Sequence, residues 1–262
     1  MRISLIAILL LAACGGSTPE PAPLPGGAMR PAPTTGTELI ERMHEAYAGR
    51  WYRTLTFVQT TKFADGRVET WHEALTVPGK LRIDVAPIAQ GKMSLFRNDS
   101  LYTFDGGNLV RSGAFVHPLM VLGFDVYADP PAETVEKLRA MGLDLEVMHT
   151  DTWQGRPSYV VGAAAGDTLT PQFWIDTERL VFTRLIERRQ PAQNAATQTS
   201  SRIETQFNDY RPLGGGWIAP EVVFIVNGEE RLREEYADMR ADVELPDSLF
   251  LPAYSEPGWV ED

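Results

Sequence analysis

Hydrophobic positions repeat at two different periods along the chain. Apolar residues from Leu39 to Tyr47 recur at helical spacing after Thr35, which lies three residues before Glu38 as in a capping box. This pattern predicts a helix of about three turns that ends near Gly49. From residue 51 onward, alternation of period two and a high content of β-branched and aromatic residues replace the helical pattern, which predicts strands for most of the remaining chain.

Turn residues separate these runs into about a dozen strands. The predicted strands are residues 51–63, 68–77, 80–85, 93–97, 101–105, 109–114, 143–149, 158–163, 172–176, 181–188, 202–210, 217–226 and 231–239. Helices are predicted at 117–124 and 131–141, a one-turn helix at 247–250, and a flexible polar loop at 191–200. The fold class is therefore mainly β with a few helices, built on one large antiparallel sheet that must curve to hide its apolar face.

The first two strands are expected to form a hairpin around the turn at residues 64–67. Counting outward from this turn places Lys62 opposite Glu69, an opposite-charge pair that favours the register. In that register Phe57 and Trp71 fall on opposite faces, so the pattern leaves open which face lines the interior.

Apolar side chains exceed what one face of a sheet needs. A packed core is one interpretation; the other is a concave face that is lined but not filled, with the apolar segment 118–124 as a lid over a pocket for acyl chains. The residues expected to line such a cavity and its lid are Phe57, Trp71, Leu81, Ile83, Leu95, Phe104, Leu119, Leu122, Phe173, Ile175, Phe207 and Phe224.

The first residues form an export signal. Arg2 precedes an apolar run of about ten residues, which is too short for a spanning helix, since such a helix needs roughly 20. The stretch 11–14, Leu-Ala-Ala-Cys, resembles the lipobox of bacterial lipoproteins. That resemblance implies that Cys14 is lipidated, with palmitate among its acyl chains, and becomes the mature N-terminus. Because Gly15 rather than Asp follows, it implies the periplasmic face of the outer membrane in a two-membrane cell; the alternative is an ordinary secretory signal.

Three segments follow from these patterns. Residues 1–13 are the predicted signal peptide, residues 14–35 the lipidated cysteine with a Pro- and Gly-rich tether, and residues 36–262 a single domain. The Pro-rich composition excludes a helix in the tether. At about 3.1 Å per residue, this extended tether would hold the domain up to roughly 60 Å from the bilayer.

Composition and charge limit the classes of molecule that the protein is expected to bind. The chain of 262 residues has 24 Lys and Arg against 35 Asp and Glu, a net charge of −11, which argues against nucleic acid and against attraction to anionic headgroups. A single cysteine excludes an internal disulfide framework and Cys-rich zinc sites. The predicted partners are acyl chains, the membrane through Cys14 and, in an alternative function, an envelope protein; we expect a monomer.

Candidate chemistry is sparse. The four histidines show no metal-ligand spacing, and no nucleophile elbow, phosphate loop or dinucleotide motif occurs. The acidic pairs at 229–230 and 234–235 are interpreted as solvated strand ends, and His72 as a half-exposed residue of the sheet. We therefore expect no enzyme activity, no metal and no cofactor.

From about Thr37 to Pro252 the chain resembles the LolA/LolB superfamily of lipoprotein carriers and outer-membrane receptors. The resemblance lies in the order of weak motifs rather than in any one of them. These motifs are the first helix, the strand ending near Gln59, Trp71, Pro78 leading into Leu81-Arg82-Ile83, the segment Asn98 to Tyr102, the lid His117 to Leu122, the strand Phe173 to Asp176, and the ending Leu245 to Pro252.

The resemblance implies a half-open barrel that is closed by short helices and holds lipoprotein acyl chains in an apolar cavity. Two positions of this chain can be compared with functional residues of the family. The carriers have an Arg that latches the barrel to the lid, whereas this chain has Val77 there. The receptor has an apolar residue on a projecting loop that faces the membrane, and Ile88 occupies a comparable place.

The leading hypothesis is a membrane-anchored lipoprotein that binds acyl chains for transfer or reception of a lipid or lipoprotein in the cell envelope. The first alternative is an envelope sensor or scaffold that uses the same sheet to bind a protein partner. An envelope hydrolase is the second, and it would require a cleft with clustered polar groups.

Overall fold

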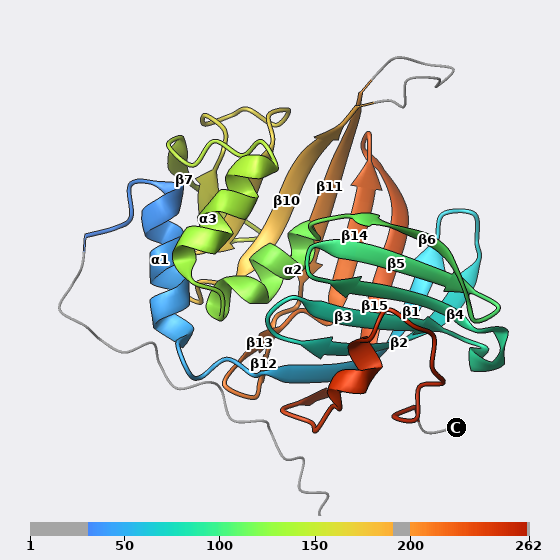
Figure 1. The fold of residues 1–262 in the computed structure, drawn as a ribbon. Helices are drawn as coiled ribbons and strands as arrows, with labels where there is room; N and C mark the ends of the chain where they lie inside the picture. Colours follow the sequence, from blue (N-terminus) through green and yellow to red (C-terminus); the bar gives the residue numbers. More distant parts are fainter. Residues whose placement is uncertain (1–30, 191–199, 261–262) are drawn as a thin grey trace, which may run out of the picture.

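The computed structural model describes residues 31–190 and 200–260. Within them a 13-stranded antiparallel sheet runs in the order β6-β5-β4-β3-β2-β1-β15-β14-β11-β10-β9-β8-β7 and does not close on itself (Figure 1). The expectation of one large, open, mainly antiparallel sheet with few helices is confirmed. Cys14, the tether up to residue 30 and most of the predicted loop at 191–200 lie outside the described residues.

Two meanders make up the sheet. The first comprises β1 (Thr54–Phe63), β2 (Val68–Thr76), β3 (Lys80–Val85), β4 (Lys92–Arg97), β5 (Ser100–Asp105) and β6 (Asn108–Ala114). The second comprises β7 (Met148–Trp153), β8 (Arg156–Val161), β9 (Gln172–Asp176), β10 (Phe182–Arg189), β11 (Ser201–Asn208) and β14 (Glu221–Val226). The last strand, β15 (Glu229–Ala241), pairs with β14 on one side and with β1 on the other, so it joins the meanders.

The remaining elements are short. They are α1 (Gly36–Tyr47), α2 (Pro118–Gly123), α3 (Pro131–Ala140), the 3-10 turns η1 (Ile88–Gln90), η2 (Asp125–Tyr127) and η3 (Asp247–Phe250), and the small hairpin of β12 (Arg211–Leu213) and β13 (Gly216–Ile218). The helices α1, α2 and α3 lie together on one face of the sheet (Figure 1). We call this covered side the concave face and the other side the convex face.

Helix α1 begins where the sequence predicts. The Thr35 hydroxyl accepts a hydrogen bond from the Glu38 amide, and the Glu38 carboxylate accepts one from the Thr34 amide at 2.7 Å. The return bond of the capping box is therefore made one residue earlier than in the standard pattern. The apolar stripe of α1 is buried, and the Gly36 amide donates to the Leu145 carbonyl, which fixes the helix start on the sheet.

The hairpin register differs from the prediction by one residue. Val68 lies opposite Lys62, and Thr61 lies opposite Glu69. Lys62 instead pairs with Glu235 of β15 at 2.6 Å, so the favourable charge pair that suggested the register is made with another strand. A shift of one residue moves side chains to the other face of a strand.

The corrected register answers the question that the sequence left open. Phe57 lies directly opposite Glu73, and Gln59 lies opposite Trp71, so the odd-numbered residues of both strands share one face. Directly opposed residues of an antiparallel pair point to the same side. Phe57 and Trp71 therefore both point to the concave face, next to Leu75.

Two predicted strands are wrong in extent. The alternating residues 143–147 are not a strand; Leu143 and Leu145 are buried in the core, and β7 starts only at Met148. The predicted strand 217–226 is two strands, because Pro220 lacks the amide that a continuous ladder needs. The first part pairs in the small hairpin and the second joins the main sheet.

The convex face of the first meander is covered by the end of the chain. Ala74, Met93, Leu95 and Phe104 pack there against Leu249 and Phe250 of η3. Arg82, which is fully buried, binds Asp84 through two nitrogens at 2.7 and 2.9 Å. Its third nitrogen donates to the Leu249 carbonyl at 3.2 Å and the Ser255 hydroxyl at 3.0 Å. The guanidinium thus connects β3 to the C-terminal segment.

Replacing Arg82 by Ala is expected to destabilise the protein by about 3–5 kcal/mol, because it leaves the Asp84 carboxylate buried without a partner. Removing both partners in Arg82→Ala/Asp84→Ala should cost less than removing Arg82 alone. Lys80→Ala is the matched control, since it breaks the link of β3 to the exposed Asp247 and should cost less than about 1 kcal/mol. Urea unfolding measures all three; equal losses for Arg82→Ala and Lys80→Ala would contradict this role.

Candidate functional site

A cavity of about 310 Å³ lies between the concave face and the segment around α2. This volume falls at the lower end of the range for small-molecule sites, roughly 300–1,000 Å³. The sheet contributes Phe57, Gln59, Trp71, Glu73, Leu75, Leu81, Ile83, Val85, Ser94, Phe96, Phe207, Phe224, Glu234 and Tyr236. The lid, by which we mean residues 117–124, contributes His117, Leu119, Met120 and Phe124.

Seven of the twelve cavity residues named from the sequence line this space. They come from five strands of the sheet and from the lid: Phe57, Trp71, Leu81, Ile83, Leu119, Phe207 and Phe224. They meet because the residues of neighbouring strands that lie opposite one another share the concave face, as with Glu73 and Ile83 or Leu75 and Leu81.

The other five do not line the cavity. Leu95 and Phe104 point to the convex face and pack against Phe250, because Leu95 lies opposite the convex residue Arg82 in the β3–β4 ladder. Leu122, Phe173 and Ile175 belong to the packed core, all without exposed surface. In this second half of the sheet, helices α1 and α3 cover the concave face, so the core interpretation holds there.

The structure places Ile88 in the turn η1 between β3 and β4. Its side chain is half-buried rather than projecting, and it is absent from the strongly exposed large apolar residues of the described chain. The comparison with a membrane-facing apolar loop residue stays a prediction.

The lid is attached to the sheet by a contact that does not involve Val77. The buried carboxylate of Asp125 in η2, directly after α2, accepts a hydrogen bond from the Gly79 amide at 2.9 Å. Gly79 occupies the β2–β3 turn with φ of +78°, a backbone conformation that favours glycine. Burial, opposed by this bond, raises the pKa of Asp125 to about 7.

Polar groups interrupt the apolar lining at its centre. Glu73 of β2 and Glu234 of β15 are only 5% and 9% exposed, and both line the cavity. The Tyr236 hydroxyl donates to the Glu234 carboxylate at 2.8 Å, and the Gln59 amide donates to the Thr61 hydroxyl at 2.8 Å. Among the described residues, Glu73 has no hydrogen-bond or ion-pair partner. The interpretation of 234–235 as a solvated strand end is wrong, because both residues lie within β15 and Glu234 is buried. The side chain of Glu235 is 45% exposed and pairs with Lys62.

Burial controls the titration of these groups. It raises the pKa of Glu234 to about 7, against the hydrogen bonds from Tyr236 and Gln59. It raises the pKa of Glu73 well above the ordinary value, and repulsion from Glu234 acts in the same direction. Burial lowers the pKa of His117 to about 4, so its imidazole is neutral at pH 7. The cavity therefore holds two carboxyl groups and no fixed positive charge among its lining residues.

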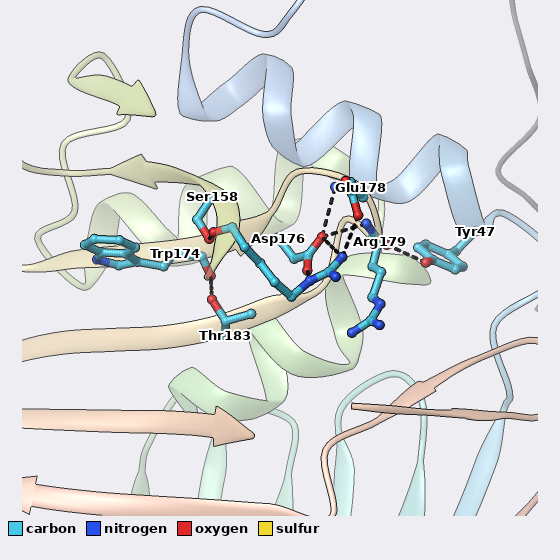
Figure 2. Close-up of polar contacts among 8 residues, drawn as sticks. Tyr47, Ser158, Trp174, Asp176, Glu178, Arg179 and Thr183 are labelled. Atoms are coloured by element: carbon cyan, nitrogen blue, oxygen red, sulfur yellow. Dashed lines mark hydrogen bonds and ion pairs between the residues drawn. The ribbon is translucent and has the colours of Figure 1, made fainter. Parts of the chain in front are cut away.

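A second pocket of about 510 Å³ lies where β8, β9 and β10 meet their turns, and it is polar. Asp176 is one of its lining residues, and Figure 2 shows its carboxylate accepting hydrogen bonds from the backbone amides of Glu178 and Arg179, both at 2.9 Å. Arg156 bonds both Asp176 and Glu178, and the Tyr47 hydroxyl of α1 donates to the Arg179 carbonyl. Asp176 thus fixes the β9–β10 turn, to which the last residue of α1, Tyr47, is hydrogen-bonded. Its role is structural.

Of three comparisons with known proteins, only the comparison with solved structures gives matches, and these concern the fold. No protein-family model matches the sequence, and no curated protein matches it significantly. A DUF1329 family protein from Desulfovibrio piger superposes with a TM-score of 0.50 at 13% identity, covering 82% of this chain and 95% of its own. A LolA superfamily protein from Nitrosomonas europaea superposes with a TM-score of 0.50 at 12% identity, covering 83% of this chain and 98% of its own. The MucA/MucB complex from Pseudomonas aeruginosa gives 0.22, which supports no inference.

The chain therefore has a LolA-like fold: one large open antiparallel sheet whose concave face is covered by short helices. The fold expected from the family resemblance is confirmed. Within residues 31–190 and 200–260, no helix combines the length and the hydrophobicity needed to cross a bilayer.

Replacing Glu234 by Gln should change how stability depends on pH. The folded-state pKa of about 7 lies above the ordinary value, so the stability contributed by the neutral acid is full below about pH 4.5 and is lost as pH rises through 7. Between pH 5 and pH 8 the wild type should lose about 2 to 3 kcal/mol relative to Glu234→Gln. Thermal unfolding across this range measures it, with the exposed Glu235→Gln as control. Parallel curves for wild type and Glu234→Gln would contradict the burial argument.

Proposed function

We propose that the protein binds the aliphatic chain of a lipid or lipoprotein in the cavity and acts in transfer or reception of that molecule in the cell envelope. The observation that supports this most strongly is the lined but unfilled concave face under α2. Apolar side chains from both meanders surround the cavity, and the lid above it is a single short helix. The LolA-like fold is consistent with the proposal.

Energetics make binding feasible without covalent chemistry. At about 0.8 kcal/mol per buried methylene, a chain of roughly fifteen methylenes would gain on the order of 10 kcal/mol. Ordering of the chain and the lid reduces this gain. The lid is a plausible point of entry, because α2 is only six residues long and is held at one end by the Asp125 contact with Gly79. The lining contains no nucleophile with an activating base, which is why we propose binding rather than hydrolysis.

Filling the cavity tests the proposal. Ser94 is a small, half-buried lining residue of β4, and Ser94→Trp should occupy the space and reduce uptake of a fluorescent long-chain fatty alcohol at least tenfold. Tyr102→Trp on β5 is the matched control, because this side chain packs on the convex face and should leave uptake unchanged. Fluorescence titration of both purified variants measures the difference.

A wild-type protein that takes up no probe would contradict the proposal. If such a protein captured a specific envelope protein instead, the sensor or scaffold function predicted as an alternative would be favoured. Equal uptake by Ser94→Trp and wild type would place the binding site elsewhere on the molecule.

We also propose that Cys14 anchors the domain to a membrane, with the Pro-rich segment as spacer. The proposal rests on the sequence, since this segment lies outside the described residues. The acidic net charge of −11 gives little attraction to anionic lipids, so an acyl anchor would supply the membrane attachment. Cys14→Ser is expected to abolish labelling with a clickable palmitate analogue and to leave the membrane fraction; a variant that stays labelled and membrane-bound would contradict the anchor.

A further inference from the structure

We propose that the cavity selects an amphiphile that carries a protonated amine next to its aliphatic chain, with Glu73 and Glu234 as the groups that recognise the amine. This inference rests on the proposed function, because it specifies the chemistry of the molecule that occupies the same cavity.

The two carboxyl groups approach the cavity from both sides of β1. Glu73 on β2 lies opposite Phe57, and Glu234 on β15 lies opposite Thr61. Gln59 lies between these two positions on the same face of β1. The two carboxyl groups are therefore staggered by four positions along β1, one on each side of Gln59, and both line the cavity where the first meander meets β15. They are close enough that repulsion from Glu234 raises the pKa of Glu73.

Hydrogen-bond acceptors exceed donors at this spot. Glu73 has no partner among the described residues, and the one hydroxyl proton of Tyr236 already goes to Glu234. The amide oxygen of Gln59 accepts no hydrogen bond from any described residue, while its nitrogen donates to Thr61 and Glu234. These oxygens face the cavity, so an occupant that displaces water from them should supply donors, because an acceptor buried without a donor is costly. An ammonium group has three donors and no acceptor.

Charge favours the same ligand. No Lys or Arg lines the cavity, so the carboxyl pair has no counter-ion from the described lining residues. An ammonium group would supply one and would favour the ionised form of the carboxyl groups. A carboxylate would be repelled by an ionised member of the pair, and a neutral alcohol would leave that member uncompensated.

The aromatic walls suit a cation as well. Phe57 and Tyr236 pack against each other with ring centroids 4.3 Å apart, and Trp71 lines the same part of the cavity. Ring faces attract ammonium groups, most strongly where water is excluded. Neighbouring apolar residues such as Leu81 and Ile83 would contact the chain.

The test compares three probes with the same twelve-carbon chain: dodecylamine, dodecanol and dodecanoate, each below its critical micelle concentration. Affinities are measured at pH 8 by displacement of a neutral fluorescent alcohol from the chain that starts at Gly15. Dodecylamine should bind at least tenfold more tightly than dodecanol, which corresponds to one good charge-assisted hydrogen bond. Dodecanoate should bind more weakly than dodecanol.

Two variants test whether the carboxyl pair causes the amine preference. Glu73→Gln/Glu234→Gln should bind the amine and the alcohol within about threefold of each other, and a cooperative thermal unfolding transition shows that this variant is folded. Glu235→Gln is the matched control: this residue is next to Glu234 in β15 but is exposed and paired with Lys62, so the amine preference should persist.

Lowering the pH should weaken the amine preference, because the carboxyl groups become protonated. Among the lining residues, the other titratable groups are His117, with its pKa lowered to about 4, and Tyr236, with its pKa raised by burial well above the ordinary value. Neither changes charge between pH 5.5 and pH 8, and an alkylamine stays protonated. The preference should therefore fall severalfold from pH 8 to pH 5.5.

The experiment distinguishes failure of the proposed function, acyl-chain binding, from failure of the proposed amine recognition. If dodecanol does not bind to wild type, the proposed function is wrong. If dodecanol binds but dodecylamine has no advantage, or if the double variant keeps the advantage, acyl-chain binding stands and the recognition of an amine by Glu73 and Glu234 is wrong.

Discussion

The pairing of β1 with β15 is the contact on which the rest of the structure depends. These strands are separated by more than half of the chain, and their ladder joins two meanders that each form only from neighbouring strands. The register shift between Thr56 and Val58 adds a local bend at this join. Without the ladder there would be two separate sheets, each with an apolar face and two free edges.

The same ladder explains where the cavity and its polar centre lie. It places Glu234 and Tyr236 on the concave face beside Gln59, while β2 brings Glu73 from the other side. The second meander has α1 and α3 over it and forms a dense core around Phe173. The first meander has only the six-residue α2 above its concave face, which leaves space unfilled. A cavity therefore results from the unequal distribution of helices over one continuous sheet.

Local signals predicted much of this fold. The start of α1, most strand positions, the short helix before residue 124 and the terminal turn follow from caps, turn residues and periodicity, which act over a few residues. The errors have equally definite causes. Lys62 satisfies its charge on β15 rather than on β2, so the expected pair gave a register that was shifted by one residue. The leucines at 143 and 145 alternate like a strand because they pack beneath a helix.

The cavity residues were predictable only in part. Phe57, Trp71 and Ile83 were named because they are apolar residues of predicted strands, although the expected register put Phe57 and Trp71 on opposite faces. Leu95 and Phe104 looked the same in the sequence, but the C-terminal segment gives the convex face a core of its own. Glu234 was interpreted as solvated because its burial depends on β1, a partner strand far away in sequence. With the correct register, an acidic residue at an inward position is the signal that identifies it.

The central claim is that the space between the lid and the first meander holds an aliphatic chain. Native mass spectrometry of the protein purified from its own cell envelope tests this most directly. The account predicts a population with the added mass of a lipid, which dissociates on collisional activation and is absent from Ser94→Trp purified in the same way. A wild-type protein found only at the mass of its own chain, or a lipid retained equally by Ser94→Trp, would contradict it.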